Sequence, residues 1–269
     1  MPTAVLDFET LRKFADTLHS TVRNSGRVIM EIYESDFGVE TKADKSPVTA
    51  ADEASEAIIL ESITAMTPDI PFVAEEHIAA HGFPKFDGHT FWLIDALDGT
   101  KEFINKRSAF TVNVGLIIEG VPSLGLIYAP AIDEFFCGIV CPTTGERAAS
   151  VIRNGYQNPM SVRSVPEDGV IVVSSYSHQI KEPMDEFLAK HTVKDIIAIG
   201  SSLKFCLIAE GKADLYPRFG PTSEWDIAAG HAVLRAAGGN IRTLNGEDMQ
   251  YKKVQDNYLN GTFVAAGTP

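Results

Sequence analysis

Apolar residues in the first third of the chain recur at helical spacing. They lie three, four or seven residues apart over one long segment: Leu11, Phe14, Leu18, Val22, Ile29 and Ile32. This spacing predicts one amphipathic helix from about residue 8 to 33. A second helix is predicted from Ala51 to about Met66, and it ends before Pro68 because the residue preceding a proline disfavours the helical conformation.

From Pro71 to about residue 140 the pattern changes from helical spacing to short apolar runs that are typical of strands. The predicted strands cover residues 72–74, 91–94, 111–118, 124–128 and 134–140. Glu119-Gly120-Val121-Pro122 separates two of these runs, and its turn chemistry predicts a hairpin.

Beyond about residue 160 strand and helix patterns alternate. Strands are predicted at 170–174, 196–200 and 214–218, and helices at 182–190, 203–210 and 225–237. This alternation indicates a βαβ type of second half. The predicted fold class is therefore α+β followed by α/β, with an N-terminal domain over residues 1–160 and a C-terminal domain over residues 161–269.

Charge and cysteine content narrow the possible partners and location. The net charge of −13 argues against binding to nucleic-acid polymers, because that binding depends on many contacts from Lys and Arg to phosphate. Three cysteines form no disulfide framework and favour a reducing compartment, so we expect a cytoplasmic protein. No apolar run approaches the roughly 20 residues that span a bilayer. A monomer is expected, and a dimer stays open.

Three acidic segments lie where strands are expected to end or helices to begin. They are Glu75-Glu76, the pair Asp95 and Asp98, and Asp226. Carboxylates at strand ends project from one edge of a sheet, where open α/β folds bind ligands. Like charges that are packed together are costly unless a cation joins them. The pattern therefore predicts a hard divalent ion with oxygen ligands, and Mg²⁺ is the usual choice where phosphate also binds.

An anion-binding segment directly follows the acidic pair. Gly99 permits close backbone approach, and a helix that starts at Thr100 would point its N–H groups at a phosphate. The alternative is that Asp98-Gly99 is only a turn and that Asp95 caps a helix. We favour the ligand site because Glu75 and Asp226 occupy similar settings.

These segments resemble known signatures. The run from Trp92 to Phe103 (WLIDALDGTKEF) resembles the first signature of the lithium-sensitive, metal-dependent inositol monophosphatase superfamily. The run from Trp225 to Gly230 (WDIAAG), with AAGG at 236–239, resembles the second. The run SPVTAAD at 46–52 is similar to the segment that supplies a catalytic aspartate. The resemblance covers nearly the whole chain and implies a layered αβαβα sandwich.

Further segments are similar to one branch of that superfamily. Lys101-Glu102-Phe103 stands where inositol monophosphatases usually carry Thr-Asn-Phe. The runs GSSLKFC at 200–206 and YPRFG at 216–220 resemble the CysQ-type 3′(2′),5′-bisphosphate nucleotidases. The implied activity is hydrolysis of the 3′-phosphate of adenosine 3′,5′-bisphosphate to AMP, by water activated with two Mg²⁺ ions. A third, weaker ion stays open.

The resemblance also implies individual roles. The implied metal ligands are four carboxylates and one backbone carbonyl: Glu75, Asp95, Asp98, Asp226 and, through its carbonyl, Leu97. Asp52 and Thr100 are implied to orient and deprotonate the attacking water. The implied substrate contacts include backbone N–H groups, side chains for the nucleotide and its second phosphate, and one metal ligand: Gly99, Thr100, His178, Ser201, Lys204, Arg218 and Asp226.

Several of these residues have structural alternatives. Asp52 could act only on the helix dipole, because it lies in the first turn of a predicted helix. Arg218 could be a solvated charge at the edge of a strand, and His178 could be an ordinary surface histidine. Lys204 begins a predicted helix, where a cation is unfavourable, and this favours a functional role.

Three alternatives concern the function itself. The same scaffold could act on inositol monophosphate, on an inositol polyphosphate or on a sugar bisphosphate. An uncharged polyol would not require Lys204 and Arg218, whereas a second phosphate would. A non-catalytic nucleotide or metal sensor is the alternative from another class. Such a sensor could lose Asp52 and Thr100 without penalty, so the presence of both argues for an enzyme.

Overall fold

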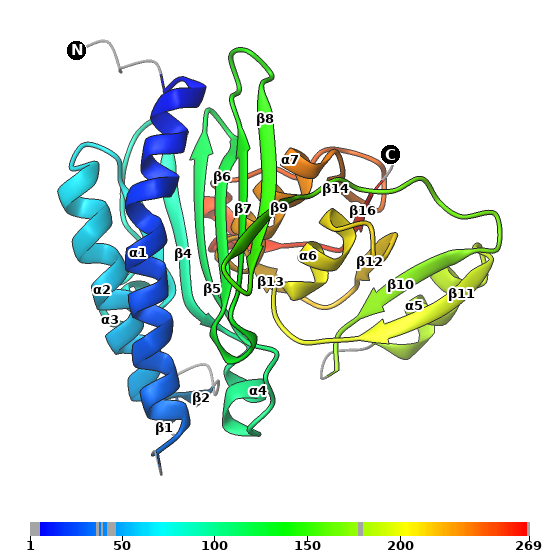
Figure 1. Cartoon of the computed structure of the whole chain (residues 1–269), viewed down its shortest axis with the longest axis horizontal. Helices are drawn as coiled ribbons and strands as arrows, with labels where there is room; N and C mark the ends of the chain where they lie inside the picture. The colour runs from blue at the N-terminus through cyan, green and yellow to red at the C-terminus, as the bar shows by residue number, and fades with distance from the viewer. Residues whose placement is uncertain (1–5, 36–37, 39, 42–46, 177–179, 268–269) are drawn as a thin grey trace.

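Helices and sheets alternate in layers across the molecule, as Figure 1 shows. The computed structural model describes residues 6–35, 38, 40–41, 47–176 and 180–267. In the described part of the chain, α1 and α2 cover one face of a seven-stranded sheet, and α6 and α7 lie between that sheet and a five-stranded one. Helix α5 adjoins the far end of the second sheet, beside β10 and β11. This arrangement confirms the layered αβαβα sandwich.

The α-helices are α1 Phe8–Tyr33, α2 Ala50–Met66, α3 Glu75–His81, α4 Thr100–Ile104, α5 Lys181–Leu188, α6 Leu203–Ala209 and α7 Glu224–Ala237. The strands of the first sheet are β3 Phe72–Ala74, β4 Phe91–Asp98, β5 Thr111–Ile118, β6 Val121–Ala129, β7 Glu134–Val140, β8 Arg147–Arg153 and β9 Tyr156–Pro159. The strands of the second sheet are β10 Val170–Ser174, β11 Val193–Ala198, β12 Leu215–Arg218, β14 Asn240–Thr243 and β16 Phe263–Ala266. Two-residue strands form two small pairs: β1 Glu40–Thr41 with β2 Pro47–Val48, and β13 Thr222–Ser223 with β15 Leu259–Asn260. Two short 3₁₀ helices complete these elements: η1 Pro130–Ile132 and η2 Val254–Asp256.

Both large sheets are mixed. In the first, β3 and β4 are parallel, and each later strand pairs antiparallel with its predecessor in the order β4 to β9. In the second, the parallel strands β11, β10 and β12 continue into antiparallel β16 and β14. The predicted βαβ alternation is therefore confirmed for the parallel part, and β14 and β16 were not predicted.

The two faces of the first sheet have separate cores. Leu11, Leu18 and Val22 of α1 are fully buried against the face that carries Val112 and Val114. The opposite face packs on α6 and α7 and shares its core with the second sheet. Because side chains alternate along a strand, Thr111, Asn113 and Gly115 of β5 point to this second face.

A row of glycines lets α7 approach the first sheet closely. Gly115, Gly125 and Gly138 are direct partners across β5, β6 and β7. A Cβ atom on Gly125 would lie 2.2 Å from the carbonyl oxygen of Ala229 in α7, which no packed structure tolerates. A Cβ on Gly138 would lie 2.4 Å from Cα of Val233. The glycine row therefore sets the position of α7, which begins at the cavity described below.

Most predicted elements are confirmed within one or two residues, including the helices at 8–33 and 51–66. The hairpin is confirmed with a tighter turn, because Glu119 and Gly120 both adopt positive φ and β6 already begins at Val121. Strand β11 lies about three residues before its predicted position. Strands β8 and β9 were not predicted.

The proposed boundary at residue 160 stays a prediction. Each large sheet is built from one side of that position, yet α7 packs against the first sheet from the C-terminal side. Among the described residues, no helix combines the length and apolar character that crossing a bilayer requires. All three cysteines carry free thiols. The cytoplasmic location expected from them stays a prediction.

Candidate active site

A cavity of about 510 Å³ lies where the C-terminal end of β4 meets the starts of α4, α6 and α7. Its lining includes four carboxylates on one side, from Glu75, Asp95, Asp98 and Asp226. Two cationic side chains, Lys204 and Arg218, also line it. Segments from both sheets therefore contribute charge of opposite sign to one space.

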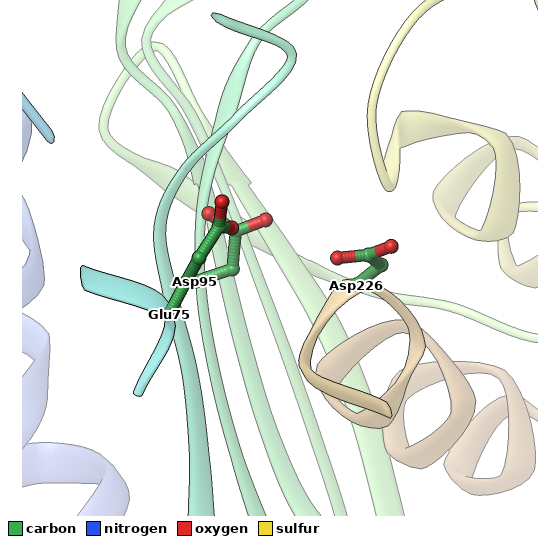
Figure 2. Close-up of side chains that lie close together, drawn as sticks. All are labelled: Glu75, Asp95 and Asp226. Atoms are coloured by element: carbon green, nitrogen blue, oxygen red, sulfur yellow. The ribbon is translucent and has the colours of Figure 1, made fainter. Parts of the chain in front are cut away.

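Three of the carboxylates converge in the way that a metal ion needs. Glu75 is the first residue of α3 directly after β3, Asp95 lies on β4, and Asp226 lies in the first turn of α7. One oxygen from each lies within 4.8 Å of the others. Figure 2 shows the carboxylates of Glu75 and Asp95 side by side, with that of Asp226 facing them from the start of its helix. Oxygen donors in this number and spacing fit a hard divalent cation.

Burial and mutual repulsion make this cluster costly without a cation. Burial raises the pKa of Asp95 well above its usual value, and the neighbouring charges of Glu75, Asp98 and Asp226 raise it further. Burial likewise raises the pKa of Asp226 well above its usual value, with added repulsion from Asp98 and Glu75. A bound cation would reverse both effects, because it favours the ionised form of each group.

Asp98 lines the same cavity but is held by different partners. Its Oδ2 accepts a hydrogen bond of 3.2 Å from Nδ2 of Asn113, and the Ser202 backbone N–H also donates to it. Burial raises the pKa of Asp98 to about 6, although Lys204 and these donors oppose the rise. The structure therefore places Asp98 beside the cluster of three, on its Lys204 side.

The predicted pair Asp52 and Thr100 is in contact. Oγ1 of Thr100 lies 3.3 Å from Oδ1 of Asp52 and 3.2 Å from the carbonyl oxygen of Leu97. Asp52 is only 3% exposed, and its Oδ2 accepts from the backbone N–H and the hydroxyl of Thr49. Asp52 therefore caps α2 in a capping box and reaches Thr100 with its other oxygen.

Gly99 turns the chain from β4 into α4. Its φ of 95° lies in the left-handed region, and a Cβ there would lie 3.0 Å from the carbonyl oxygen of Ala109. Both requirements favour glycine. The turn brings Leu97, Gly99 and Thr100 together to the cavity wall, as predicted from the sequence.

Lys204 is almost completely buried in the first turn of α6. Its side chain is 6% exposed, its Nζ donates to the carbonyl oxygen of Ser201, and the ammonium lies 5.3 Å from the ring centre of Tyr216. Burial lowers the pKa of Lys204 to about 8, although the negative charge of Asp98 opposes the change. Ser201 adopts a φ of 52° and also lines the cavity.

Arg218 is not the solvated edge charge that the sequence left as an alternative. It is 8% exposed at the end of β12, and its guanidinium donates to the carbonyl oxygens of Gly220 and Pro221 at 3.1 and 3.0 Å. Two of its five N–H donors therefore hold the loop that leads to α7, while the side chain still lines the cavity. His178 lies outside the described residues.

Sequence reasoning missed several supporting residues. Glu56 of α2 accepts from the backbone N–H groups of Glu76 and His77 at 2.8 and 2.6 Å, and so caps the helix that carries Glu75. No local pattern marks Glu56, because its role depends on how α2 packs on α3. Asn113 does have a signal, since it is an amide within the otherwise apolar run TVNVGLII.

Comparison with known proteins agrees with this geometry. The family model of the inositol monophosphatase family matches residues 10–268, and the chain belongs to that family. The chain is 40% identical over 250 residues to the 3′(2′),5′-bisphosphate nucleotidase CysQ of Escherichia coli K12, which covers 92% of this chain and 97% of the relative. It is 42% identical over 243 residues to CysQ of Salmonella typhimurium, over 90% of this chain and 94% of that one.

Two solved structures show the same fold. CysQ from Bacteroides thetaiotaomicron, a bacterial member of the family, superposes with a TM-score of 0.74 at 33% identity over 95% of this chain and 97% of that one. An inositol monophosphatase from Anabaena superposes with a TM-score of 0.75 at 28% identity over 96% and 92%.

Proposed function

We propose that this protein is a metal-dependent 3′(2′),5′-bisphosphate nucleotidase that hydrolyses the 3′-phosphate of adenosine 3′,5′-bisphosphate to AMP and phosphate. One observation carries the proposal. The three convergent carboxylates share a single cavity with two buried cations, Lys204 and Arg218. The identity to curated CysQ nucleotidases supports the same substrate.

The carboxylates fit the Mg²⁺ ions that this chemistry uses. Glu75, Asp95 and Asp226 would hold one or two ions, with Asp98 and the carbonyl of Leu97 as further ligands. Bound Mg²⁺ would lower the pKa of the attacking water and neutralise charge on the transferring phosphate and leaving oxygen. We propose two ions, and a third stays open.

Asp52 and Thr100 are the proposed water-activating pair. The Thr100 hydroxyl can accept a proton from the water while it donates its own toward Oδ1 of Asp52, which lies 3.3 Å away. Because Asp52 is buried and fixed by Thr49, the pair is oriented before substrate binds. The backbone N–H groups of Gly99 and Thr100 are proposed to bind the phosphate that is cleaved.

The second phosphate explains the cations. A site with this many carboxylates repels a phosphate that is not bound to metal, so a bisphosphate needs a positive group at a distance from the cluster. Lys204 and Arg218 are proposed to fill that role, with Ser201 beside them. His178 is a proposed nucleotide contact by family resemblance.

A substrate panel tests the proposal. Phosphate release would be measured with Mg²⁺ for adenosine 3′,5′-bisphosphate, adenosine 3′-phosphate, inositol 1-phosphate and fructose 1,6-bisphosphate. We expect the highest kcat/KM for the nucleotide bisphosphate. Preference for inositol 1-phosphate would overturn the substrate assignment, and full activity in chelator would overturn the metal-dependent mechanism. A protein that binds the nucleotide but releases no phosphate would be a sensor.

Lys204→Met offers a sharper test of the substrate residues. The methionine keeps most of the buried stem but removes the charge. Losing one charged hydrogen bond of about 1.5–3 kcal/mol should raise KM for the bisphosphate about tenfold or more. Hydrolysis of inositol 1-phosphate should change much less. Equal losses on both substrates would mean that Lys204 acts only in folding.

A further inference from the structure

A buried chain of polar side chains links the first sheet to the start of α6. Oγ of Ser202 donates to Oδ1 of Asn113 at 2.6 Å, and Oγ1 of Thr111 lies 2.9 Å from Oγ of Ser202. Nδ2 of Asn113 donates to Oδ2 of Asp98 at 3.2 Å. Thr111 and Asn113 are fully buried, and Ser202 is 1% exposed. Buried networks of this kind fix the relative positions of their members when every partner is satisfied.

The direction of each hydrogen bond follows from the donors available. An ionised carboxylate only accepts, so the amide NH₂ of Asn113 faces Asp98 and its oxygen faces Ser202. The single hydroxyl proton of Ser202 goes to that oxygen, so Thr111 donates its own proton to Ser202. An aspartate in place of Asn113 could not donate to Asp98 and would add a like charge beside it.

The two ends of this network carry different parts of the site. Asn113 is the direct partner of Asp95 in the pairing of β4 with β5, so it belongs to the strands that hold the carboxylates. Ser202 follows Ser201 and stands two residues before Lys204. The hydrogen bond between Ser202 and Asn113 therefore ties the segment that carries the proposed second-phosphate contacts to the strands that carry the metal ligands.

The turn that presents Ser202 has few other ways to settle. Ser201 adopts a left-handed φ of 52°, and a Cβ on Gly200 would lie 2.6 Å from the carbonyl oxygen of Ala109. Residues 200–202 are thus pressed against the chain just before β5 while Ser202 bonds into that strand. A change at Ser202 Oγ would release this turn without touching a carboxylate.

We propose that Asn113 and Ser202 are positioning residues that determine specificity for a second phosphate. Their hydrogen bond sets the distance between the carboxylate cluster and Lys204, and so selects substrates whose two phosphates match that distance. The inference rests on the proposed nucleotidase function. It adds a prediction that this function does not make, because neither residue needs to touch the substrate.

The test compares two nucleotides that differ only in the second phosphate. Adenosine 3′,5′-bisphosphate and adenosine 3′-phosphate share the base, the sugar and the bond that breaks. The readout is the discrimination ratio, the kcat/KM for the first divided by that for the second. In Ser202→Ala we expect the ratio to fall about threefold to tenfold, the equivalent of one hydrogen bond. The backbone N–H of residue 202 still donates to Asp98 in this variant, so kcat on adenosine 3′-phosphate should be nearly unchanged.

A double-mutant cycle separates positioning from a general loss of structure. If Ser202 acts through Lys204, then Ser202→Ala should change the ratio less than about twofold when Lys204 is already Met, since coupled residues are not additive. Thr111→Val is the matched control, because it removes a hydrogen bond to the same hydroxyl but leaves Ser202 bonded to Asn113. It should cost similar stability and keep the wild-type ratio.

Each outcome decides between the readings. Equal losses on both nucleotides in Ser202→Ala, or a full effect in the Lys204→Met background, would overturn the inference while the nucleotidase function stands. Where Ser202→Ala folds poorly, Asn113→Ala serves instead, with a lower kcat on both nucleotides and the same fall in the ratio expected. A wild type that does not prefer the bisphosphate would overturn the proposed function itself, and the inference with it.

Discussion

Replacing Asp226 by Asn should stabilise the metal-free protein and remove its response to Mg²⁺. The physical reason is that Asp226 shares a cluster with Glu75 and Asp95, in which the nearest carboxylate oxygens lie within 4.8 Å of one another. Burial and this repulsion raise its pKa well above the usual value, so the ionised form costs free energy in the folded state. Asparagine has the same shape without the charge.

The magnitude follows from Coulomb's law and from the cap that Asp226 makes. At 4.8 Å and an effective dielectric constant of about 20, each fully ionised pair costs about 3 kcal/mol. Partial protonation at neutral pH reduces this cost, and losing a negative charge in the first turn of α7 costs about 0.3–1 kcal/mol. The hydrogen bond from the Ser223 backbone N–H, 2.8 Å in the wild type, can be kept by the amide oxygen. The net gain should be on the order of 1–3 kcal/mol, a rise in Tm of roughly 3–10 °C.

Thermal unfolding in chelator and in Mg²⁺ measures both effects. Wild type should gain Tm on adding Mg²⁺, by about 2.7 kcal/mol of linkage at a hundred times Kd, whereas Asp226→Asn should gain little. Asp52→Asn is the matched control, because Asp52 occupies the same capping-box position in α2 but is not part of the cluster of three. It should not raise the Tm in chelator and should keep the Mg²⁺ response. A lower Tm for metal-free Asp226→Asn would refute the repulsion argument, and an unchanged Mg²⁺ response would show that Asp226 is not a ligand.

Three other measurements probe the remaining structure. Asp52→Asn should lower kcat by on the order of 10²-fold or more with KM nearly unchanged, since base assistance is worth roughly 10²–10⁴; a loss of substrate binding with kcat intact would contradict its role. Gly125→Ala should cost about 1–3 kcal/mol in urea unfolding and reduce Mg²⁺ affinity, because α7 must move away from the sheet; wild-type Mg²⁺ affinity would mean that the glycine row does not position Asp226. Burial lowers the pKa of His231 to about 3, so its neutral form contributes stability above the unfolded pKa of 6.5 that is lost as pH falls. Wild type should therefore lose ~2 kcal/mol more than His231→Gln between about pH 7.5 and about pH 5 in urea unfolding, and parallel losses would count against this burial.

Local patterns predicted the helices and most strands because each depends on its own residues. The spacing of Leu11, Leu18 and Val22 appears as a buried face of α1, and the apolar run before Asp95 appears as β4. Strands β14 and β16 were missed, although they complete the second sheet. Asn240–Thr243 and Phe263–Ala266 are only four residues each, and their place is set by pairing with each other and with β12.

The arrangement of the site was harder to predict than its residues. The acidic motifs identified Glu75, Asp95 and Asp226, but no pattern shows that α7 crosses to the first sheet and brings Asp226 to them. That crossing depends on three glycines in neighbouring strands, which become a row only once the strands are in register. The contact of Ser202 with Asn113 spans 89 residues and likewise depends on the tertiary fold.

Two aspartates show why structural and functional roles need not compete. Asp52 and Asp226 each occupy the third position of a helix, and each accepts from the backbone N–H of the residue that begins the cap, Thr49 or Ser223. One carboxylate oxygen fixes the side chain to its own helix, and the group then presents its remaining capacity in one direction, toward Thr100 or toward Glu75 and Asp95. A capping box therefore serves as the device that orients a reactive carboxylate. The patterns T-x-x-D at 49–52 and S-x-x-D at 223–226 were visible in the sequence, so here a helix-start signal supports the functional assignment.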